Sequence, residues 1–201
     1  MARSISANGE VIYGTSWDNS DYGMLYWEKE GAGFGRPQWV GEDVREITPT
    51  VMQYQDGTEY DYNLVNGCIC QAQLTKISPS GKWIATTYRT ETPSANRQYV
   101  EYTYAAAFYN TETGTTTIVE DYGETTGVHV TDDGIGFIGI GTLGVSAGKV
   151  YDLNTHTDLG DTQDWVYDTY GIVIPGGYIN HISADGRYVL GTSAQSSAGG
   201  T

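Results

Sequence analysis

The fold of this chain is decided by a repeated stretch, whose last copy reads His181-Ile182-Ser183-Ala184-Asp185-Gly186-Arg187-Tyr188-Val189-Leu190-Gly191-Thr192-Ser193. Three earlier stretches follow the same pattern. They begin Ser4-Ile5-Ser6-Ala7-Asn8-Gly9, Lys76-Ile77-Ser78-Pro79-Ser80-Gly81 and His129-Val130-Thr131-Asp132-Asp133-Gly134. We therefore read the chain as copies of one structural unit.

Each copy of the repeat predicts a β-hairpin. A hydroxyl residue and a small polar residue precede the glycine, and such side chains bond nearby backbone N–H groups while glycine supplies a positive φ. Apolar residues flank the turn on both sides, which predicts two strands that face a core. The positions four before and three after the glycine are Ile5, Ile77, Val130 and Ile182, then Ile12, Ile84, Phe137 and Val189.

The residues after each hairpin predict two further strands. An aromatic residue followed by an acid or amide recurs as Trp27-Glu28, Tyr109-Asn110 and Tyr151-Asp152. A turn and a second short strand follow the last two of these. The later glycines are about fifty residues apart, and four short strands in such a period are typical of a propeller blade.

These motifs resemble the HAF-type and TolB- or WD40-like repeats of bacterial β-propeller proteins. The resemblance covers nearly the whole chain, although the Gly-His…Trp-Asp pattern of WD40 repeats is absent. It implies an all-β fold, a propeller or propeller fragment of about four four-stranded antiparallel units. The alternative is another repetitive antiparallel architecture, a sandwich or a solenoid.

We expect residues 1–201 to form a single propeller-like domain. The predicted repeat units are 4–41, 67–123, 124–160 and 178–195, and the inserts are 42–66 and 161–177. The last unit has only two strands, so we expect a piece of a longer protein, or a ring closed by the last hairpin against the first strands. Open edge strands would then pair with the rest of the propeller or with another chain.

Composition excludes several functions. The chain has 27 glycines, 17 tyrosines and only 10 lysines and arginines, and its net charge is −15. This turn-rich, β-forming composition offers no segment of helical period. A strongly acidic surface repels nucleic acids and anionic membranes, and no apolar run is long enough for membrane insertion. We expect an exported bacterial protein, either periplasmic, on the cell surface or secreted.

No catalytic, metal or cofactor site emerges from the motifs. Cys68 and Cys70 lack the further soft ligands of a metal site, and two residues apart in one strand they are poorly placed for a disulfide. His129 and His181 share one repeat position. We interpret both as imidazoles hydrogen-bonded between units, with anion or metal binding near the axis as the alternative.

Aromatic residues in the inserts are the predicted ligand surface. The Asp56-Gly57 pair predicts a hairpin with a two-residue loop in the first insert. Rings with a polar tip on loops suit recognition of glycans or proteins. The candidates are Tyr54, Tyr60, Tyr62, Trp165, Tyr167 and Tyr170, which we expect on one face. The function predicted is a non-catalytic binding or scaffold module. The alternative is a carbohydrate-active enzyme, a glycoside hydrolase or lyase.

Overall fold

The computed structural model is an all-β protein with antiparallel sheets and one described α-helix. It describes residues 2–18, 21–67, 69, 75–140, 147–173, 177–183 and 188–193. Cys68, Cys70 and Gly186 lie outside the described residues. The expectations for them are therefore not tested.

The first two sheets are meanders of consecutive strands. The first has the order β1-β2-β3-β4, and β5 also pairs with β3. Its strands are β1 (Ala2–Ile5), β2 (Val11–Asp18), β3 (Asp21–Glu30), β4 (Gly33–Phe34) and β5 (Gln38–Trp39). The second sheet has β8 (Lys76–Ile77), β9 (Trp83–Pro93), β10 (Val100–Asn110) and β11 (Thr115–Val119), also neighbours in chain order.

The third sheet contains the remaining C-terminal strands. They are β12 (Thr125–Val130), β13 (Ile135–Ile140), β14 (Ala147–Asp152), β15 (Thr157–Asp161), β16 (Gly177–Ile182) and β17 (Val189–Ser193). The β16–β17 hairpin joins β14 through the pair Ala147–Ile179. A separate hairpin is made of β6 (Glu46–Gln53) and β7 (Glu59–Asn66), and it follows the short 3-10 helix η1 (Glu42–Val44).

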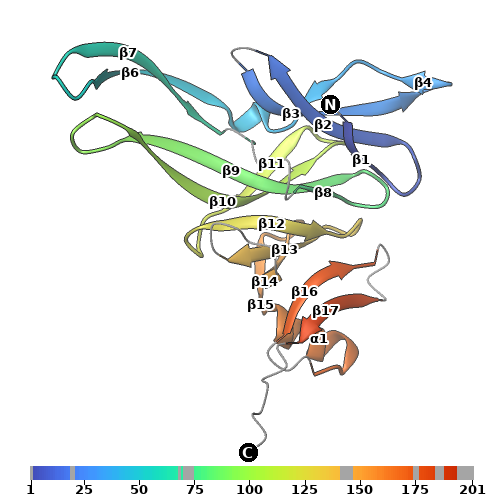
Figure 1. Ribbon diagram of the computed structural model, residues 1–201. Coiled ribbons are helices and arrows are strands. Elements are labelled where there is room, and N and C mark those ends of the chain that lie inside the picture. The colour runs from blue at the N-terminus through green and yellow to red at the C-terminus, as the bar shows by residue number, and fades with distance from the viewer. Residues whose placement is uncertain are drawn as a thin grey trace, which may run out of the picture.

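The sheets stack face to face, and a core lies in each gap (Figure 1). Val11, Met24 and Tyr26 of the first sheet meet Ile84 and Tyr109 of the second. The opposite face of the second sheet packs on the third, and the third is covered in turn by helix α1 (Thr162–Tyr170). The next core residues are Trp83, Ala85, Ala106, Phe108, Val130 and Ile138, then Phe137, Val150 and Val166.

The hydroxyl of each repeat closes its turn as the pattern predicts. Ser6 Oγ accepts the backbone N–H of Val11 at 2.9 Å, and Ser78 Oγ accepts that of Trp83 at 3.1 Å. Thr131 and Ser183 accept the N–H groups of Ile135 and Tyr188 at 3.0 and 2.7 Å. The glycines of the first three turns, Gly9, Gly81 and Gly134, have φ of 73°, 87° and 81°.

Successive turns are also bonded to one another along one edge of the stack. Asn8 Nδ2 donates to the carbonyl of Ser80 at 3.0 Å. The Ser80 N–H and Oγ both donate to Asp132 Oδ1, at 2.9 and 2.6 Å. The repeated turn therefore fixes the position of each sheet on the one before it, as well as closing its own hairpin.

The third turn is one residue shorter than the others, and this corrects the repeat alignment. Thr131 pairs with Ile135, whereas Ser6 and Ser78 each pair with the residue five positions later. Side chains alternate between the two faces of a strand, so one residue moves every following side chain to the other face. Phe137 therefore corresponds to Tyr13 and Ala85, not to Ile12 and Ile84.

The prediction that the residue four before the glycine points into a core is wrong for the first copy. Val130 is fully buried against the second sheet, and Ile77 packs partly buried against the first. Ile5 is 52% exposed. In the second and third copies this position faces the preceding sheet, and no described layer precedes the first one.

Two further elements differ from the sequence-based expectation. The helix α1 occupies the predicted insert 161–177, with Asp161 as N-cap and Gly171 in the left-handed conformation at its end. Thr162 and Val166 are its buried residues. The β9–β10 hairpin is closed by another copy of the repeat turn, Ser94-Ala95-Asn96-Arg97-Gln98-Tyr99, in which Arg97 takes the glycine position at φ 58°.

Matched substitutions separate the packing of the sheets from backbone strain. We expect Gly9→Ala to lower the free energy of unfolding by about 1 kcal/mol, because its positive φ is unfavourable for a residue with a Cβ while the space around it is open. Gly81→Ala also places a Cβ at 2.4 Å from Val11 Cγ2, whereas nothing lies within 4 Å at Gly9. Overpacking adds about 1–3 kcal/mol at Gly81. Urea unfolding of both variants measures the difference, and equal losses would contradict this packing.

Alkaline titration tests the core between the first two sheets. Burial raises the pKa of Tyr26 and Tyr109 above the ordinary value of 10.0. The folded state thus favours the neutral phenols, so their contribution to stability is complete below pH 10 and is lost as pH rises through the raised values. We expect tyrosinate absorbance to appear at higher pH than in urea-unfolded protein. Tyr26→Phe should reduce the loss of stability, and an unchanged profile would contradict this burial.

Candidate functional site

A long two-layered arm projects from the stack and forms one side of the candidate site. The pairing of β11 with β10 covers only Ala106–Asn110, so the rest of the β9–β10 hairpin extends past its sheet. The β6–β7 hairpin lies on this extension (Figure 1). We call residues 46–66 and 87–104 together the arm.

Backbone groups of the two hairpins tie the arm together. At its tip the Gln53 N–H donates to the carbonyl of Arg97 at 2.9 Å, and at its base the Gly67 N–H donates to that of Arg89 at 3.0 Å. The hairpin predicted at Asp56-Gly57 is confirmed, but its predicted two-residue loop is wrong. The Tyr54 N–H donates to the Thr58 carbonyl across a three-residue loop, in which Gly57 has φ 84°.

A buried carboxylate lies between the two hairpins of the arm. Glu91 is 4% exposed, and its Oε1 contacts Arg89 at 2.6 Å. Its Oε2 accepts the Val65 N–H at 3.0 Å, while its own N–H donates to Asn66 Oδ1 at 2.8 Å. The Arg89 guanidinium also lies 4.8 Å from the ring centre of Tyr102. A carboxylate in this position is stable because it is paired and hydrogen-bonded.

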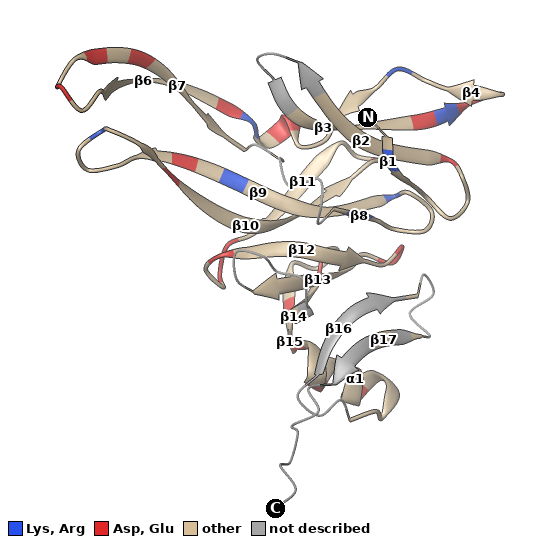
Figure 2. Ribbon diagram, viewed as in Figure 1, with Lys and Arg blue, Asp and Glu red and all other residues tan. Residues whose placement is uncertain are grey.

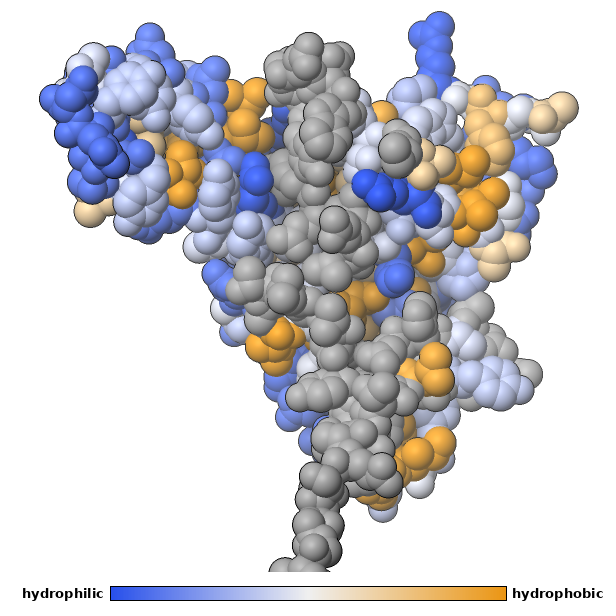
Figure 3. Space-filling model, viewed as in Figure 1, coloured by the Kyte–Doolittle hydropathy of each residue, from blue (hydrophilic) through white to orange (hydrophobic). Residues whose placement is uncertain are grey.

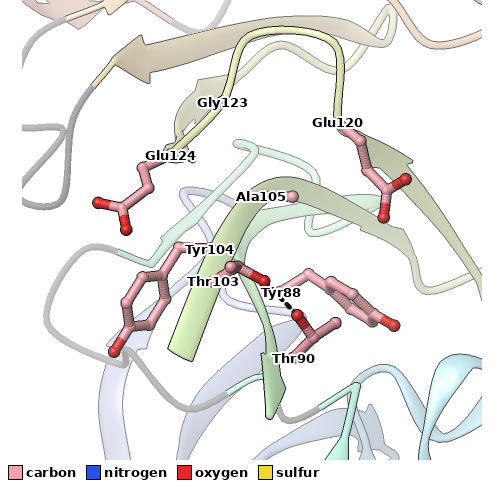
Figure 4. A pocket seen from close by; sticks show the side chains of 8 residues that line it. All are labelled: Tyr88, Thr90, Thr103, Tyr104, Ala105, Glu120, Gly123 and Glu124. Atoms are coloured by element: carbon pink, nitrogen blue, oxygen red, sulfur yellow. Dashed lines mark hydrogen bonds between the residues drawn. The ribbon is translucent and has the colours of Figure 1, made fainter. Parts of the chain in front are cut away.

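A cleft opens between the arm and the connection from β11 to β12. Its volume is about 270 Å³, and Figure 4 shows its eight lining residues. Thr90 and Thr103 form the floor, and their hydroxyls are hydrogen-bonded to each other. Tyr88 and Glu120 lie at one end, on the same side of β10 as these threonines, and Tyr104 and Glu124 lie at the other end, on the opposite side of that strand. The remaining lining residues are Ala105 and Gly123.

The cleft is electrostatically negative. Glu120 and Glu124 are both exposed. Burial raises the pKa of the Tyr88 phenol, and the charges of Glu120 and Glu46 raise it further. Figure 2 shows the acidic residues of the β11–β12 connection beside the arm. An anion entering this cleft is repelled by the carboxylates of Glu46, Glu120 and Glu124.

A second hollow, of about 460 Å³, lies beside Trp39 at the junction of the first two sheets. One of its carboxylates, Asp43, already accepts hydrogen bonds from the backbone N–H and the hydroxyl of Thr116, at 2.7 and 2.6 Å. The indole is enclosed by Arg45, at 5.9 Å from its centre, and by Gly23, where a Cβ would lie 2.5 Å from the ring. Two aromatic residues, Trp39 and Tyr109, and two carboxylates, Glu42 and Asp43, line this hollow.

The structure brings three of the predicted ligand residues together on the arm. The rings of Tyr54 and Tyr60 lie 4.5 Å apart, and Tyr54 is 57% exposed. The hydroxyl of Tyr62 lies 3.5 Å from the Glu91 carboxylate and helps to hold the arm. Ligand binding by these residues stays a prediction.

The other three aromatic candidates lie on helix α1, far from the arm at the opposite end of the stack (Figure 1). Trp165 packs edge-on against Phe137 at 5.4 Å and against Tyr170 at 5.7 Å, so these two rings cap the core of the third sheet. Tyr167 is 55% exposed. The six aromatic residues do not form a single surface, because the two inserts join different layers.

The two histidines lie on the equivalent strands β12 and β16. His129 is half-buried, with its ring centre 6.0 Å from that of Phe137. The side chain of His181 lies outside what the structure describes. Across the described residues, no group of three or more His, Cys, Asp or Glu side chains is arranged to hold a metal ion.

Two comparisons with known proteins found no match. No model of a protein family matches this chain, and no curated protein sequence matches it. Of the helices that the structure describes, none is both long and apolar enough to span a bilayer.

The residues of the cleft were not among the sequence-based candidates. Glu120-Asp121-Tyr122-Gly123-Glu124 is a dense acidic turn at the predicted boundary between two units. Residues 91–104 interrupt the repeat between the second and third strands of the second unit, and Thr103 lies within them, with Tyr88 and Thr90 just before. Both signals were present, but only the stacking of the third sheet under the arm brings them together.

The buried Glu91 predicts how the arm responds to substitution. We expect Glu91→Ala to leave the Val65 N–H without its acceptor and Arg89 without its counter-ion, so the β6–β7 hairpin should loosen. Hydrogen exchange at Val65 should become at least about tenfold faster, a change of roughly 1.4 kcal/mol in local opening. Exposed Glu101→Ala in the same arm is the control. Equal exchange rates in the two variants would show that Glu91 does not hold the arm.

Proposed function

We propose that this chain is a non-catalytic binding module that takes a glycan or protein ligand into the cleft between the arm and the β11–β12 connection. The observation that carries the proposal is the pairing of a tyrosine with a glutamate at each end of that cleft. Tyrosine rings offer an apolar body with a polar tip, and carboxylates accept hydrogen bonds from a ligand.

The surface also favours recognition through a cleft. On the face shown in Figure 3, the described hydrophobic residues form separate patches divided by hydrophilic ones. A broad apolar patch is the usual mark of a flat protein-docking surface. A partner recognised through a few placed polar and aromatic groups fits this face better.

We propose that the sheets are blades of a β-propeller or propeller fragment of the kind found in bacterial repeat proteins. Three observations support this: consecutive strands form each of the first two sheets, the sheets stack face to face, and the repeat turns bond from sheet to sheet. The first strands β1, β8 and β12 also lie next to one another, as blade strands around a common axis do.

A carbohydrate-active enzyme is the second candidate, and one observation favours it. Glu120 and Glu124 lie on opposite sides of the same cleft, as the two carboxyl groups of a glycosidase do. The general acid of such enzymes depends on an apolar environment to stay protonated. Both glutamates are exposed to solvent, so the cleft lacks that environment and the binding function is preferred.

We propose an exported bacterial setting, on the cell surface, in the periplasm or secreted. The net charge of −15 supports solubility and is unsuited to contact with nucleic acids or anionic membranes. Fractionation of the native host, followed by immunoblotting, tests this location. Recovery of the protein only from the cytoplasmic fraction would contradict it.

Substitution of the tyrosines tests the binding function. We expect the double variant Tyr88→Ala/Tyr104→Ala to lose most of its signal on a glycan array or in a pull-down, because stacking on each ring contributes about 1 kcal/mol. Tyr167→Ala, which removes the exposed ring on α1, is the matched control. Thermal melting should show that both proteins remain folded. Loss of binding in the control alone would move the site to the helix.

A further inference from the structure

We infer that the cleft binds positively charged side chains, and that its partner is a basic, lysine- or arginine-rich segment of a protein. This inference rests on the proposed binding function and names the chemistry of the ligand. None of the eight described residues that line the cleft is a lysine, arginine or histidine, whereas two are glutamates. Glu46 adds a third carboxylate close enough to influence Tyr88.

The tyrosine rings give a cation a second kind of contact. A cation over an aromatic face is attracted by the negative face of the ring, and this attraction adds to that of a nearby carboxylate. The protein already uses such contacts internally. Lys149 Nζ lies 5.5 Å from the ring centre of Tyr122 and also 3.1 Å from Asp161 Oδ1. This combination of ring and carboxylate is present at each end of the cleft, with Tyr88 and Glu120 at one end and Tyr104 and Glu124 at the other.

The shape of the cleft favours side chains over larger ligands. Its volume of about 270 Å³ is slightly below the usual range for drug-sized molecules. The two Thr hydroxyls of the floor bond to each other, and Ala105 is apolar, so the floor suits the methylene stems of Lys or Arg. The two charged ends allow two basic residues of one segment to be bound together.

The negative charge of the protein also favours basic partners before they come into contact. An acidic protein attracts basic segments and repels acidic ones over a distance that salt shortens. A neutral glycan gains nothing from this attraction, and an anionic glycan is repelled by the three carboxylates. The ligand that uses both the rings and the carboxylates is therefore the basic segment.

The test compares three probes on the same protein. Fluorescence anisotropy measures binding of a short labelled peptide with two lysines, of the same peptide with both lysines acetylated, and of a neutral oligosaccharide. We expect the charged peptide to bind and acetylation to weaken binding at least about tenfold, because acetylation removes the cations. Raising the salt concentration should weaken the charged peptide as well.

Two variants of equal net charge locate the interaction. Glu120→Gln/Glu124→Gln should weaken binding of the charged peptide at least about tenfold, since the paired carboxylates are lost. Glu59→Gln/Glu101→Gln removes the same number of charges from exposed positions of the arm and should change affinity less than about twofold. Similar losses in the two variants would mean that only the overall charge attracts the peptide, and the inference would be wrong.

Other results would distinguish the basic ligand from the more general binding function. If the oligosaccharide binds and Tyr88→Ala/Tyr104→Ala abolishes that binding, the module function holds and the basic ligand is wrong. If a free polyamine binds more tightly than the peptide, the ligand is a small amine and the protein partner is wrong. If no probe depends on Tyr88 and Tyr104, both the inference and the proposed function fail.

Discussion

Close contact between the backbones of successive sheets is the constraint on which the structure depends. At Gly127 in β12, an added Cβ would lie 2.8 Å from the Ala107 carbonyl and 2.9 Å from backbone atoms of Thr86. At Gly136 in the next strand, it would lie 2.8 Å from the Phe108 ring. The third sheet can approach the second this closely only because these positions have no side chain. The buried alanines Ala85 and Ala106 serve the same purpose on the facing sheet.

The hydroxyl turns add direction to this packing. A hydrophobic face alone allows two sheets to slide over one another, whereas hydrogen bonds from one turn to the next set a single position. The links from Asn8 to Ser80 and from Ser80 to Asp132 run along one edge of the stack. In the first two turns the small polar residue before the glycine, Asn8 or Ser80, accepts a backbone N–H of its own hairpin and also bonds to the next turn.

The site arises where the repeat departs from its own pattern. In the second sheet β9 and β10 run past their neighbours β8 and β11, so no described strand of that sheet pairs with this extension. The β6–β7 hairpin packs on the extension, and the cleft opens between the extension and the β11–β12 connection. Burial of Glu91 with Arg89 keeps the two hairpins aligned, and so keeps Tyr88 and Tyr104 in place beside the acidic connection. Regular repeats provide the stack, and the irregular strand length provides the binding surface.

The sequence by itself determined the all-β class, the hairpins of the repeat and the turn at Asp56-Gly57, because these depend on local side-chain and backbone chemistry. Tertiary structure decided the rest. The exposure of Ile5 depends on which sheets surround it. The face of the strand to which Phe137 points depends on a turn that is one residue shorter than the others. Residues 162, 165, 166 and 170 of helix α1 have the spacing of one buried helix face. This pattern is too short to predict a helix, and its apolar residues are buried only because they pack against Phe137 and Val150. Tyr88 and Glu120 meet only through packing, since no local pattern records which connection lies under a projecting hairpin.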